Sequence, residues 1–337
     1  MKKYVSILII GSMLSLCFTV NSTSINTTRA TSTGNILYVC GSEPKNYSSI
    51  SESTSDDWYY LPPYTNYAPA GLPDFDQKQQ NDWGLNEKHS QAFCGPVSLA
   101  NILWWFDSKN SDPDGFPGDG NDSYPLISKY TDLEKPIPGP YNDDHGFDNV
   151  NDANTSWKKT KKSGELLEKL AWYCDTTWFK IPFFRLPGTD PIQMKLGFKK
   201  WLRDAGLKNH YNFSLYIRPS FSFICDHVQN NDGVILNMAF YTPGERLVSF
   251  RFGHYVSVAG IKRDGGIALS DPYVDKDFPL PEGKDYGYHN DAGIVSHDHY
   301  NISYDSPLLF FSDWWIPDYP LGDGVLIRSA IVISQVE

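Results

Sequence analysis

The sequence predicts an α+β fold in which helices come first and a strand-rich, mainly antiparallel half follows. Helical spacing of apolar residues dominates the globular region before about residue 206, and alternating strand patterns dominate from residue 211 onward. Each expected strand is bounded by Gly, Pro or Asp. With 337 residues, of which 40% are hydrophobic and 15% aromatic, the chain has enough apolar residues for one large or two ordinary domains.

The first 30 residues have the layout of a secretory signal peptide. Lys2 and Lys3 precede an apolar run over residues 4–20 without charged side chains, and a polar stretch rich in Asn, Ser and Thr follows. An uncleaved membrane anchor is the alternative, because the run approaches the roughly 17–20 residues that a spanning helix needs. We expect residues 1–30 to be cleaved, leaving a protein that is secreted or held at the cell surface without stable membrane association.

Two regions are expected after the signal peptide. Residues 31–73 are rich in Ser, Thr, Tyr and Pro and lack clear periodicity, which predicts an N-terminal extension or a pro-segment. Residues 74–337 have the composition of a globular domain. The net charge of −11 and the pI near 5.2 argue against a nucleic-acid partner, because an acidic protein repels the phosphate backbone.

Three helices are expected in the first part of the domain. The first spans about 94–107, and the second spans about 163–173. Asp190 followed by Pro191 is a start signal for the third helix, which ends near Gly206. The apolar residues expected to bury this third helix are Ile192, Leu196, Trp201 and Leu202.

Strands and one short helix are expected in the rest of the domain. Ser220 is a candidate cap for a short helix that ends at Gln229. Gly265 and Gly266 form a tight-turn signal between the last two expected strands, which predicts a hairpin. The expected strands cover residues 211–217, 233–240, 247–252, 254–261 and 267–270.

Cys94 stands where a thiol becomes reactive, at the start of the first helix and after a polar loop. Backbone N–H groups at a helix N-terminus lack intrahelical partners and the helix dipole favours negative charge there, so both stabilise the nucleophilic thiolate. Pro96 suits the first helical turn, where its missing N–H has no cost. A small core residue is the alternative for any lone cysteine. The other cysteines that remain after signal cleavage, which allow at most one disulfide, are Cys40, Cys174 and Cys225.

His254 and Asp271 are expected to lie side by side. His254 begins one strand of the predicted hairpin, and Asp271 follows the last residue of the other strand. A carboxylate beside an imidazole fixes its tautomer and stabilises the imidazolium, which suits a general base and its orienting partner. A structural histidine and an ordinary Asp-Pro turn are the alternatives. Cys94 is distant in the sequence, so the fold must assemble the three residues.

Three short blocks together resemble the papain-like cysteine peptidases. They are Cys-Gly-Pro-Val-Ser-Leu-Ala from Cys94, Gly-His-Tyr-Val-Ser-Val-Ala-Gly from Gly253, and Ser-Asp-Pro from Ser270. The likeness spans roughly residues 74–275 and is greatest to peptidases that process bacteriocin leaders and to their secreted relatives, with immunoglobulin-cleaving peptidases more distant. It implies a papain-like fold with the cysteine-bearing helix packed on a mainly antiparallel sheet.

The resemblance also implies an enzyme that needs no cofactor and acts on a polypeptide. Cys94 would be the nucleophile, His254 the general base and acid, and Asp271 the residue that orients the imidazole. Peptide bonds would be hydrolysed through a thioester intermediate. Two alternatives stay open: a transpeptidase-type acyl transferase, and a non-catalytic surface-binding module on the same fold.

The side chain that would complete the oxyanion hole is a glutamine in such enzymes, placed shortly before the cysteine. In many of them it lies six positions upstream, where this chain has Lys88. The candidates are Gln77, Gln79 and Gln91. Gln77 is favoured because the segment from Asp74 to Gln77 resembles the short extended segment that bears this glutamine in the relatives.

Two further clusters contain metal-binding side chains. The loop over 107–122 is rich in oxygen donors that could bind Ca²⁺, although their spacing does not match the helix–loop–helix calcium motif and a solvated acidic loop is the alternative. These donors are Asp107, Asp112, Asp114, Asp119, Asn121 and Asp122. The second cluster lacks the ligand spacing of a zinc site, so a polar surface is expected there. It comprises His289, Asp291, His297, Asp298 and His299.

Overall fold

The computed structural model describes part of the chain. The described residues are 58–64, 71–75, 77, 92–110, 123–127, 166–176, 188–240, 253–274, 297–305, 312–320 and 324–336. All of them belong to one unit, Leu37–Glu337. The expected signal peptide and the expected strand over 247–252 lie outside the described residues.

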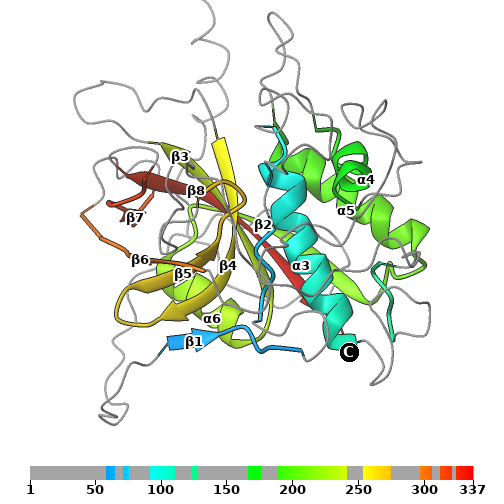
Figure 1. Cartoon of the computed structure of the whole chain (residues 1–337), viewed down its shortest axis with the longest axis horizontal. Helices are drawn as coiled ribbons and strands as arrows, with labels where there is room; N and C mark the ends of the chain where they lie inside the picture. The colour runs from blue at the N-terminus through cyan, green and yellow to red at the C-terminus, as the bar shows by residue number, and fades with distance from the viewer. Residues whose placement is uncertain are drawn as a thin grey trace, which may run out of the picture. The chain divides into compact units, whose positions relative to one another are not determined.

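An antiparallel sheet forms the centre of the fold (Figure 1). Its main path through the described residues is β2 (Tyr211–Ile217), β8 (Val325–Gln335), β3 (Gly233–Phe240), β4 (Gly253–Lys262), β5 (Gly266–Ser270) and β6 (Asp298–Asn301). Off this path, β1 (Trp58–Tyr60) pairs with β4, and β7 (Trp315–Ile316) pairs with β8. Helices and an antiparallel sheet together confirm the α+β class.

Four helices in the described part of the chain accompany the sheet: α3 (Cys94–Asn110), α4 (Leu166–Tyr173), α5 (Pro191–Asp204) and α6 (Phe221–Gln229). Figure 1 shows α3, α4 and α5 together beside the sheet. Here α3 packs on β3 and β4, and α5 packs on α4 and β2. The fourth helix, α6, packs on β3 and β4. The predicted caps are confirmed, because Asp190 and Ser220 each accept a backbone N–H in the first turn of their helix.

The helix α3 lies inside the core rather than on its surface. Every residue from Cys94 to Ser108 is buried. A helix that is buried on every side has no polar stripe. The spacing of apolar residues indicates burial on one side of this helix only, so that prediction is incomplete. The backbone of β3 approaches it closely: a Cβ atom at Gly233 would lie 2.3 Å from the side chain of Ile102. Glycine therefore allows the sheet and α3 to meet.

The buried face of α5 differs from the predicted one. Ile192 and Leu196 are 60% and 48% exposed, so their assignment to the core is wrong. The reason is Gly197, where a Cβ atom would lie 2.6 Å from the carbonyl oxygen of Tyr173. This close approach turns the glycine side of α5 towards α4 and rotates Ile192 and Leu196 outward. The residues that α5 buries are Met194, Gly197, Phe198, Trp201 and Leu202.

Part of the predicted N-terminal extension joins the sheet. Trp58–Tyr60 form β1, which pairs antiparallel with Gly260–Lys262 of β4. The pairing continues one residue further, where the Leu61 N–H donates to the Ala259 carbonyl at 2.9 Å. Residues 71–75 and 77 then lie beside the end of β5, which is the region of the candidate site.

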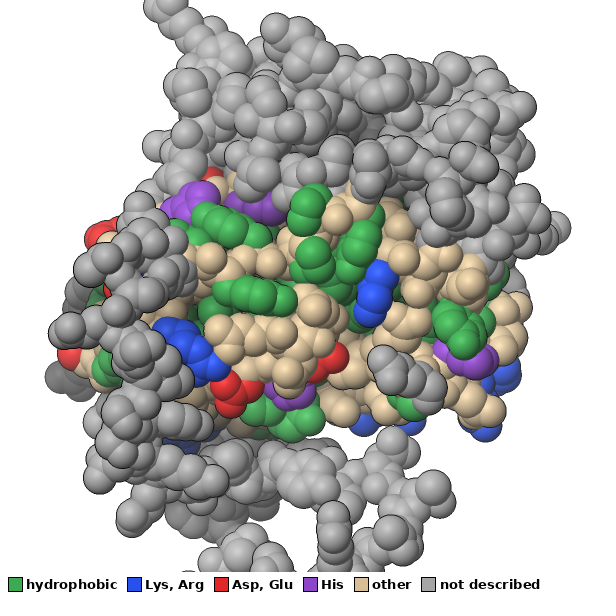
Figure 2. Space-filling model, turned by 90° about the horizontal axis from the view of Figure 1, so that it is seen from below, with side chains coloured by type: hydrophobic (Ala, Val, Ile, Leu, Met, Phe, Trp, Pro, Cys, Tyr) green, Lys and Arg blue, Asp and Glu red, His purple; other side chains and the backbone are tan. Residues whose placement is uncertain are grey.

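The described surface is mixed in character. On the face seen in Figure 2, apolar, cationic, acidic and histidine side chains are scattered among polar ones. Exposed large apolar residues lie on several separate elements, which is ordinary for a folded domain. In the part of the chain that the structure describes, no helix is both long and apolar enough to cross a membrane.

Candidate active site

Cys94 is the first residue of α3 and is almost completely buried. The helix begins there because the carbonyl oxygen of Phe93 accepts the first hydrogen bond, from the Val97 N–H at 3.0 Å. A Cβ atom at Gly95 would lie 2.8 Å from the Thr189 side chain. Thr189 is itself fixed, since its carbonyl oxygen accepts a hydrogen bond from the Tyr255 hydroxyl at 2.9 Å. The segment that enters α5 therefore lies directly beside the backbone at the start of α3.

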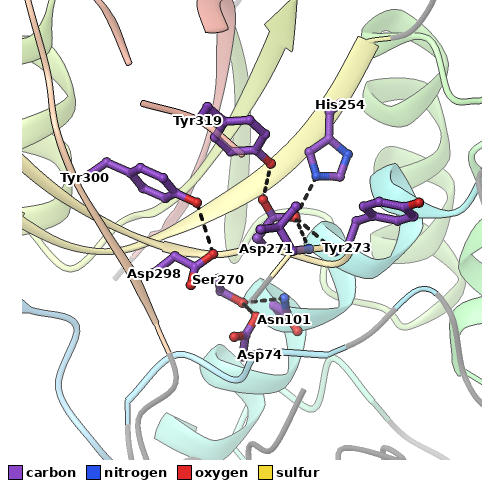
Figure 3. A network of polar contacts seen from close by, with 10 residues as sticks. Asp74, Asn101, His254, Ser270, Asp271, Tyr273, Asp298, Tyr300 and Tyr319 are labelled. Atoms are coloured by element: carbon purple, nitrogen blue, oxygen red, sulfur yellow. Dashed lines mark hydrogen bonds and ion pairs between the residues drawn. The ribbon is translucent and has the colours of Figure 1, made fainter. Parts of the chain in front are cut away.

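His254 and Asp271 form a buried pair, as predicted from the hairpin (Figure 3). The Nε2 atom of His254 lies 2.7 Å from Oδ1 of Asp271, and their side chains are 7% and 0% exposed. The register explains the contact: Ser257 of β4 faces Ser270 of β5, so the start of β4 lies beside the residue that follows β5. Gly265 closes the hairpin at φ +119°, a backbone conformation that glycine adopts at little cost.

Cys94 as well as Asp271 lies close enough to the imidazole of His254 to affect its pKa. Because Nε2 faces Asp271, Nδ1 is the ring nitrogen left for the thiol. Burial by itself lowers the pKa of His254, but the charge and hydrogen bond of Asp271, together with the hydrogen bond and charge of Cys94, outweigh it and raise the pKa to about 10. The raised pKa favours the charged imidazolium form of His254, beside the carboxylate of Asp271.

Asp271 is held ionised by several donors. Its Oδ1 atom accepts the backbone N–H groups of Tyr273 at 2.9 Å and of Val274 at 3.3 Å, and its Oδ2 atom accepts the hydroxyl of Tyr319 (Figure 3). Burial by itself raises the pKa of Asp271, but the charge of His254 and these hydrogen bonds lower it below its ordinary value. The carboxylate thus stays charged and fixed in orientation.

Tyr319 is a site residue that the sequence analysis misses. Burial, followed by the charge of Asp271, raises its pKa well above the ordinary value, so the phenol stays neutral and donates its proton to the carboxylate. Its ring stacks on Tyr300 at 5.5 Å and contacts Phe240 at 5.9 Å. A tyrosine 48 residues beyond Asp271, outside the three resembling blocks, has no sequence signal that would place it here.

Gln77 lies next to the pair through its backbone. Its N–H donates to the carbonyl of Pro272 at 2.7 Å, directly after Asp271. Its side chain is 2% exposed, and its amide oxygen has no hydrogen-bond partner among the described residues. A buried amide oxygen without a hydrogen-bond partner lowers the stability of the fold. A protein keeps such a group where the group has a function other than packing. Gln79 and Gln91, the other two candidates, lie outside the described residues.

Asp107, the first member of the acidic loop, holds backbone groups. It is completely buried, and its Oδ1 atom accepts the N–H groups of Leu126 at 2.7 Å and of Ile127 at 3.0 Å. This carboxylate holds residues 126 and 127 against α3, a role that its acidic neighbours in the sequence do not indicate. The other five members of the expected cluster lie outside the described residues.

Replacing Asp107 by alanine is expected to lower the free energy of unfolding by about 2–4 kcal/mol, because two buried N–H groups lose their acceptor. Urea unfolding followed by tryptophan fluorescence measures the change. Asp264→Ala is the matched control: it removes an exposed carboxylate that faces Lys262 across 3.2 Å, and should change stability by less than about 1 kcal/mol. Equal stability of the two variants would contradict the structural role of Asp107.

The histidine cluster is divided among separate partners. The Nε2 atom of His297 lies 2.7 Å from the Leu72 carbonyl, and that of His299 lies 2.8 Å from the Tyr60 hydroxyl. Among the described residues, no group of three or more His, Cys, Asp or Glu side chains could hold a metal ion. His289 and Asp291 lie outside the described residues.

The two other described cysteines, Cys174 and Cys225, form no disulfide with each other or with Cys94 and are buried in the core. Burial raises the pKa of the Cys225 thiol to about 11. Because both side chains are almost completely buried, they serve as internal reference thiols for Cys94. Cys40 lies outside the described residues.

The comparisons with protein-family models and with curated proteins find no match to this chain. The fold nevertheless brings the three resembling blocks to one place, through Cys94, His254 and Asp271. The functional interpretation therefore rests on the residues and geometry of this chain.

Proposed function

We propose that this protein is a cysteine peptidase with a papain-like fold, which hydrolyses peptide bonds of a polypeptide substrate. The observation that supports it most is a buried imidazole, His254, which is hydrogen-bonded to Asp271 and lies close enough to Cys94 for that thiol to affect its pKa. A thiol at a helix N-terminus, an imidazole and a fixed carboxylate in series are the parts that thiol-dependent acyl transfer requires.

In the proposed reaction, the Cys94 thiolate attacks the peptide carbonyl and forms a tetrahedral intermediate. The imidazolium of His254 then gives its proton to the leaving amine, the C–N bond breaks, and a thioester remains on Cys94. A water molecule gives a proton to the neutral imidazole and attacks the thioester, which releases the carboxylic acid and restores the thiolate. Asp271 holds the imidazole in one orientation throughout.

The oxyanion of the tetrahedral intermediate needs preorganised donors. We assign these to the backbone N–H of Cys94, at the N-terminus of α3, and to the side-chain amide of Gln77. Burial of this amide and its backbone bond beside Asp271 support the assignment. Gln77, Cys94, His254 and Asp271 are therefore the proposed catalytic residues.

The proposal predicts that iodoacetamide modifies Cys94 selectively at pH 7. Peptide mapping by mass spectrometry should find the adduct on Cys94 well before Cys174 or Cys225. The His254→Ala variant should react about 30-fold more slowly, since an unassisted thiol is only a few per cent ionised at this pH. Equal labelling of the three cysteines, or unchanged labelling in His254→Ala, would refute an activated nucleophile.

Peptidase activity itself is tested with a proteome-derived peptide mixture. Wild-type protein and the Cys94→Ala variant are incubated with the mixture, and new peptide termini are identified by mass spectrometry. Cleavages present only with the wild type support a peptidase. Ligated peptides in place of cleaved ones would identify a transpeptidase, and selective labelling without any Cys94-dependent product would identify a binding module that has kept its site.

A further inference from the structure

The segment that bears Gln77 is hydrogen-bonded to side chains of two other elements, α3 and β5. We call its described residues, 71–75 and 77, the strap. Two side chains outside the strap hold it: Asn101 in the third turn of α3, and Ser270 at the end of β5. We call this pair of residues the clip.

Asn101 uses both ends of its side-chain amide. Its Oδ1 atom accepts the backbone N–H of Phe75 at 3.1 Å, and its Nδ2 atom donates to Oγ of Ser270 at 2.9 Å (Figure 3). Asn101 is completely buried, so neither bond competes with solvent. The amide thus joins three elements: α3, the strap and β5.

Ser270 continues the connection in the other direction. Its hydroxyl donates to the carbonyl of Pro73 at 2.6 Å and faces Oδ1 of Asp74 at 2.8 Å. Ser270 immediately precedes Asp271, and the strap returns to the same place where the Gln77 N–H donates to Pro272. The Ser270 hydroxyl therefore links the strap to the end of β5, directly before Asp271, the hydrogen-bond partner of His254.

The clip gives α3 a fixed relation to the strap. Asn101 lies seven residues after Cys94, which is about 10 Å along the same rigid helix. A helix that bears Cys94 at its first residue and holds the strap near its middle sets the distance between Cys94 and Gln77 without direct contact. Phe75 adds a packing contact to the same helix, at 5.5 Å and 84° from the Trp104 ring.

We propose that Asn101 and Ser270 are positioning residues for the oxyanion hole, holding the Gln77 amide at the place where negative charge develops on the substrate. This inference rests on the proposed function, and it goes further by naming residues that act through Gln77 rather than on the substrate. Displacement of a catalytic group by about 1 Å can lower a rate on the order of 100-fold, so a clip of this kind has a measurable effect.

Two small reagents separate the oxyanion hole from the nucleophile. Iodoacetamide reacts by direct displacement: the S–C bond forms, iodide leaves, and no oxyanion develops. In acylation by p-nitrophenyl acetate, the thiolate adds to the carbonyl, an oxyanion forms and collapses, and p-nitrophenolate leaves without needing a proton. The ratio of the acylation rate to the alkylation rate therefore reports the oxyanion hole alone.

The variants are Ser270→Ala and Asn101→Asp, the latter keeping an oxygen for the Phe75 N–H while losing the donor to Ser270. Both should lower acylation by roughly 10- to 100-fold and leave alkylation of Cys94 unchanged. The matched control is Ser98→Ala, which removes a buried hydroxyl from the same helix. That hydroxyl has no hydrogen-bond partner among the described residues, so neither rate should change.

A double-mutant cycle tests whether the clip acts through Gln77. Combining Ser270→Ala with Gln77→Ala should lower acylation no further than Gln77→Ala alone, because a positioning residue has no effect once its target is absent. Additive losses, equal losses of acylation and alkylation, or an unchanged ratio in both clip variants would each overturn the inference. Acylation that persists at the wild-type rate in the Cys94→Ala variant would instead refute the proposed function.

Discussion

Peptide hydrolysis is expected to decline as the pH rises through about 10, and the Asp271→Asn variant should lose it at much lower pH. Hydrolysis needs the protonated imidazole of His254, whose pKa of about 10 depends first on the charge of Asp271 among the groups that raise it. Asparagine keeps an oxygen for the imidazole N–H but has no charge, so the pKa falls towards the ordinary value. At pH 9 the variant should hydrolyse peptide on the order of 100-fold more slowly than the wild type.

The measurement is the pH dependence of kcat/KM for a peptide that the wild-type enzyme cleaves. Asp264→Asn, which neutralises an exposed carboxylate in the hairpin turn, is the matched control and should leave the alkaline limb in place. Acylation by p-nitrophenyl acetate should lack this limb, because p-nitrophenolate leaves unprotonated. An alkaline limb in Asp271→Asn identical to that of the wild type would contradict the role assigned to the His254–Asp271 pair.

Replacing Gln77 by alanine is expected to lower acylation by p-nitrophenyl acetate about 100- to 1000-fold, the usual cost of losing one oxyanion-hole donor. Alkylation by iodoacetamide should be unchanged, because the cysteine–histidine pair remains. Stopped-flow detection of p-nitrophenolate, with the Cys94→Ala background subtracted, measures the first rate.

Gln79→Ala and Gln91→Ala are the natural comparisons, since the sequence alone does not separate these glutamines from Gln77. Both should retain the wild-type ratio of acylation to alkylation. A loss confined to Gln79→Ala or Gln91→Ala would move the oxyanion donor to that residue. It would also contradict the inference that Asn101 and Ser270 act by positioning Gln77.

The predictable part of the site is the part encoded within one hairpin. His254 and Asp271 meet because a glycine turn and a continuous antiparallel register place them, and both signals are local in the sequence. Cys94 was predictable for a similar reason: a polar loop followed by apolar residues at helical spacing marks a helix start. Each inference needed fewer than 20 neighbouring residues.

The parts that escaped prediction depend on distant packing. Tyr319 reaches Asp271 only because its ring lies against Phe240 and Tyr300, which come from β3 and β6. Asp107 has acidic neighbours in the sequence, yet its own role is set by the N–H groups of residues 126 and 127. No local pattern contains either relation.

The strand β8 shows a second limit. It is almost continuously buried, so it lacks the alternation that identifies a half-exposed strand, and the sequence analysis makes no prediction for it. The face of α5 illustrates the same problem for helices, since a single glycine contact with α4 decides which of its apolar residues lie inside. Periodicity identifies an element more reliably than it identifies the neighbours of that element.

The position of β8 has a consequence for the order in which the sheet can form during synthesis. This strand lies between β2 and β3, although the ribosome makes it more than 80 residues after β3. A nascent chain can already contain Cys94, His254 and Asp271 while β2 and β3 still lack the strand that joins them. Along the described path β2 joins the sheet only through β8, so β2 cannot be linked to β3 until residues 325–335 have been synthesised.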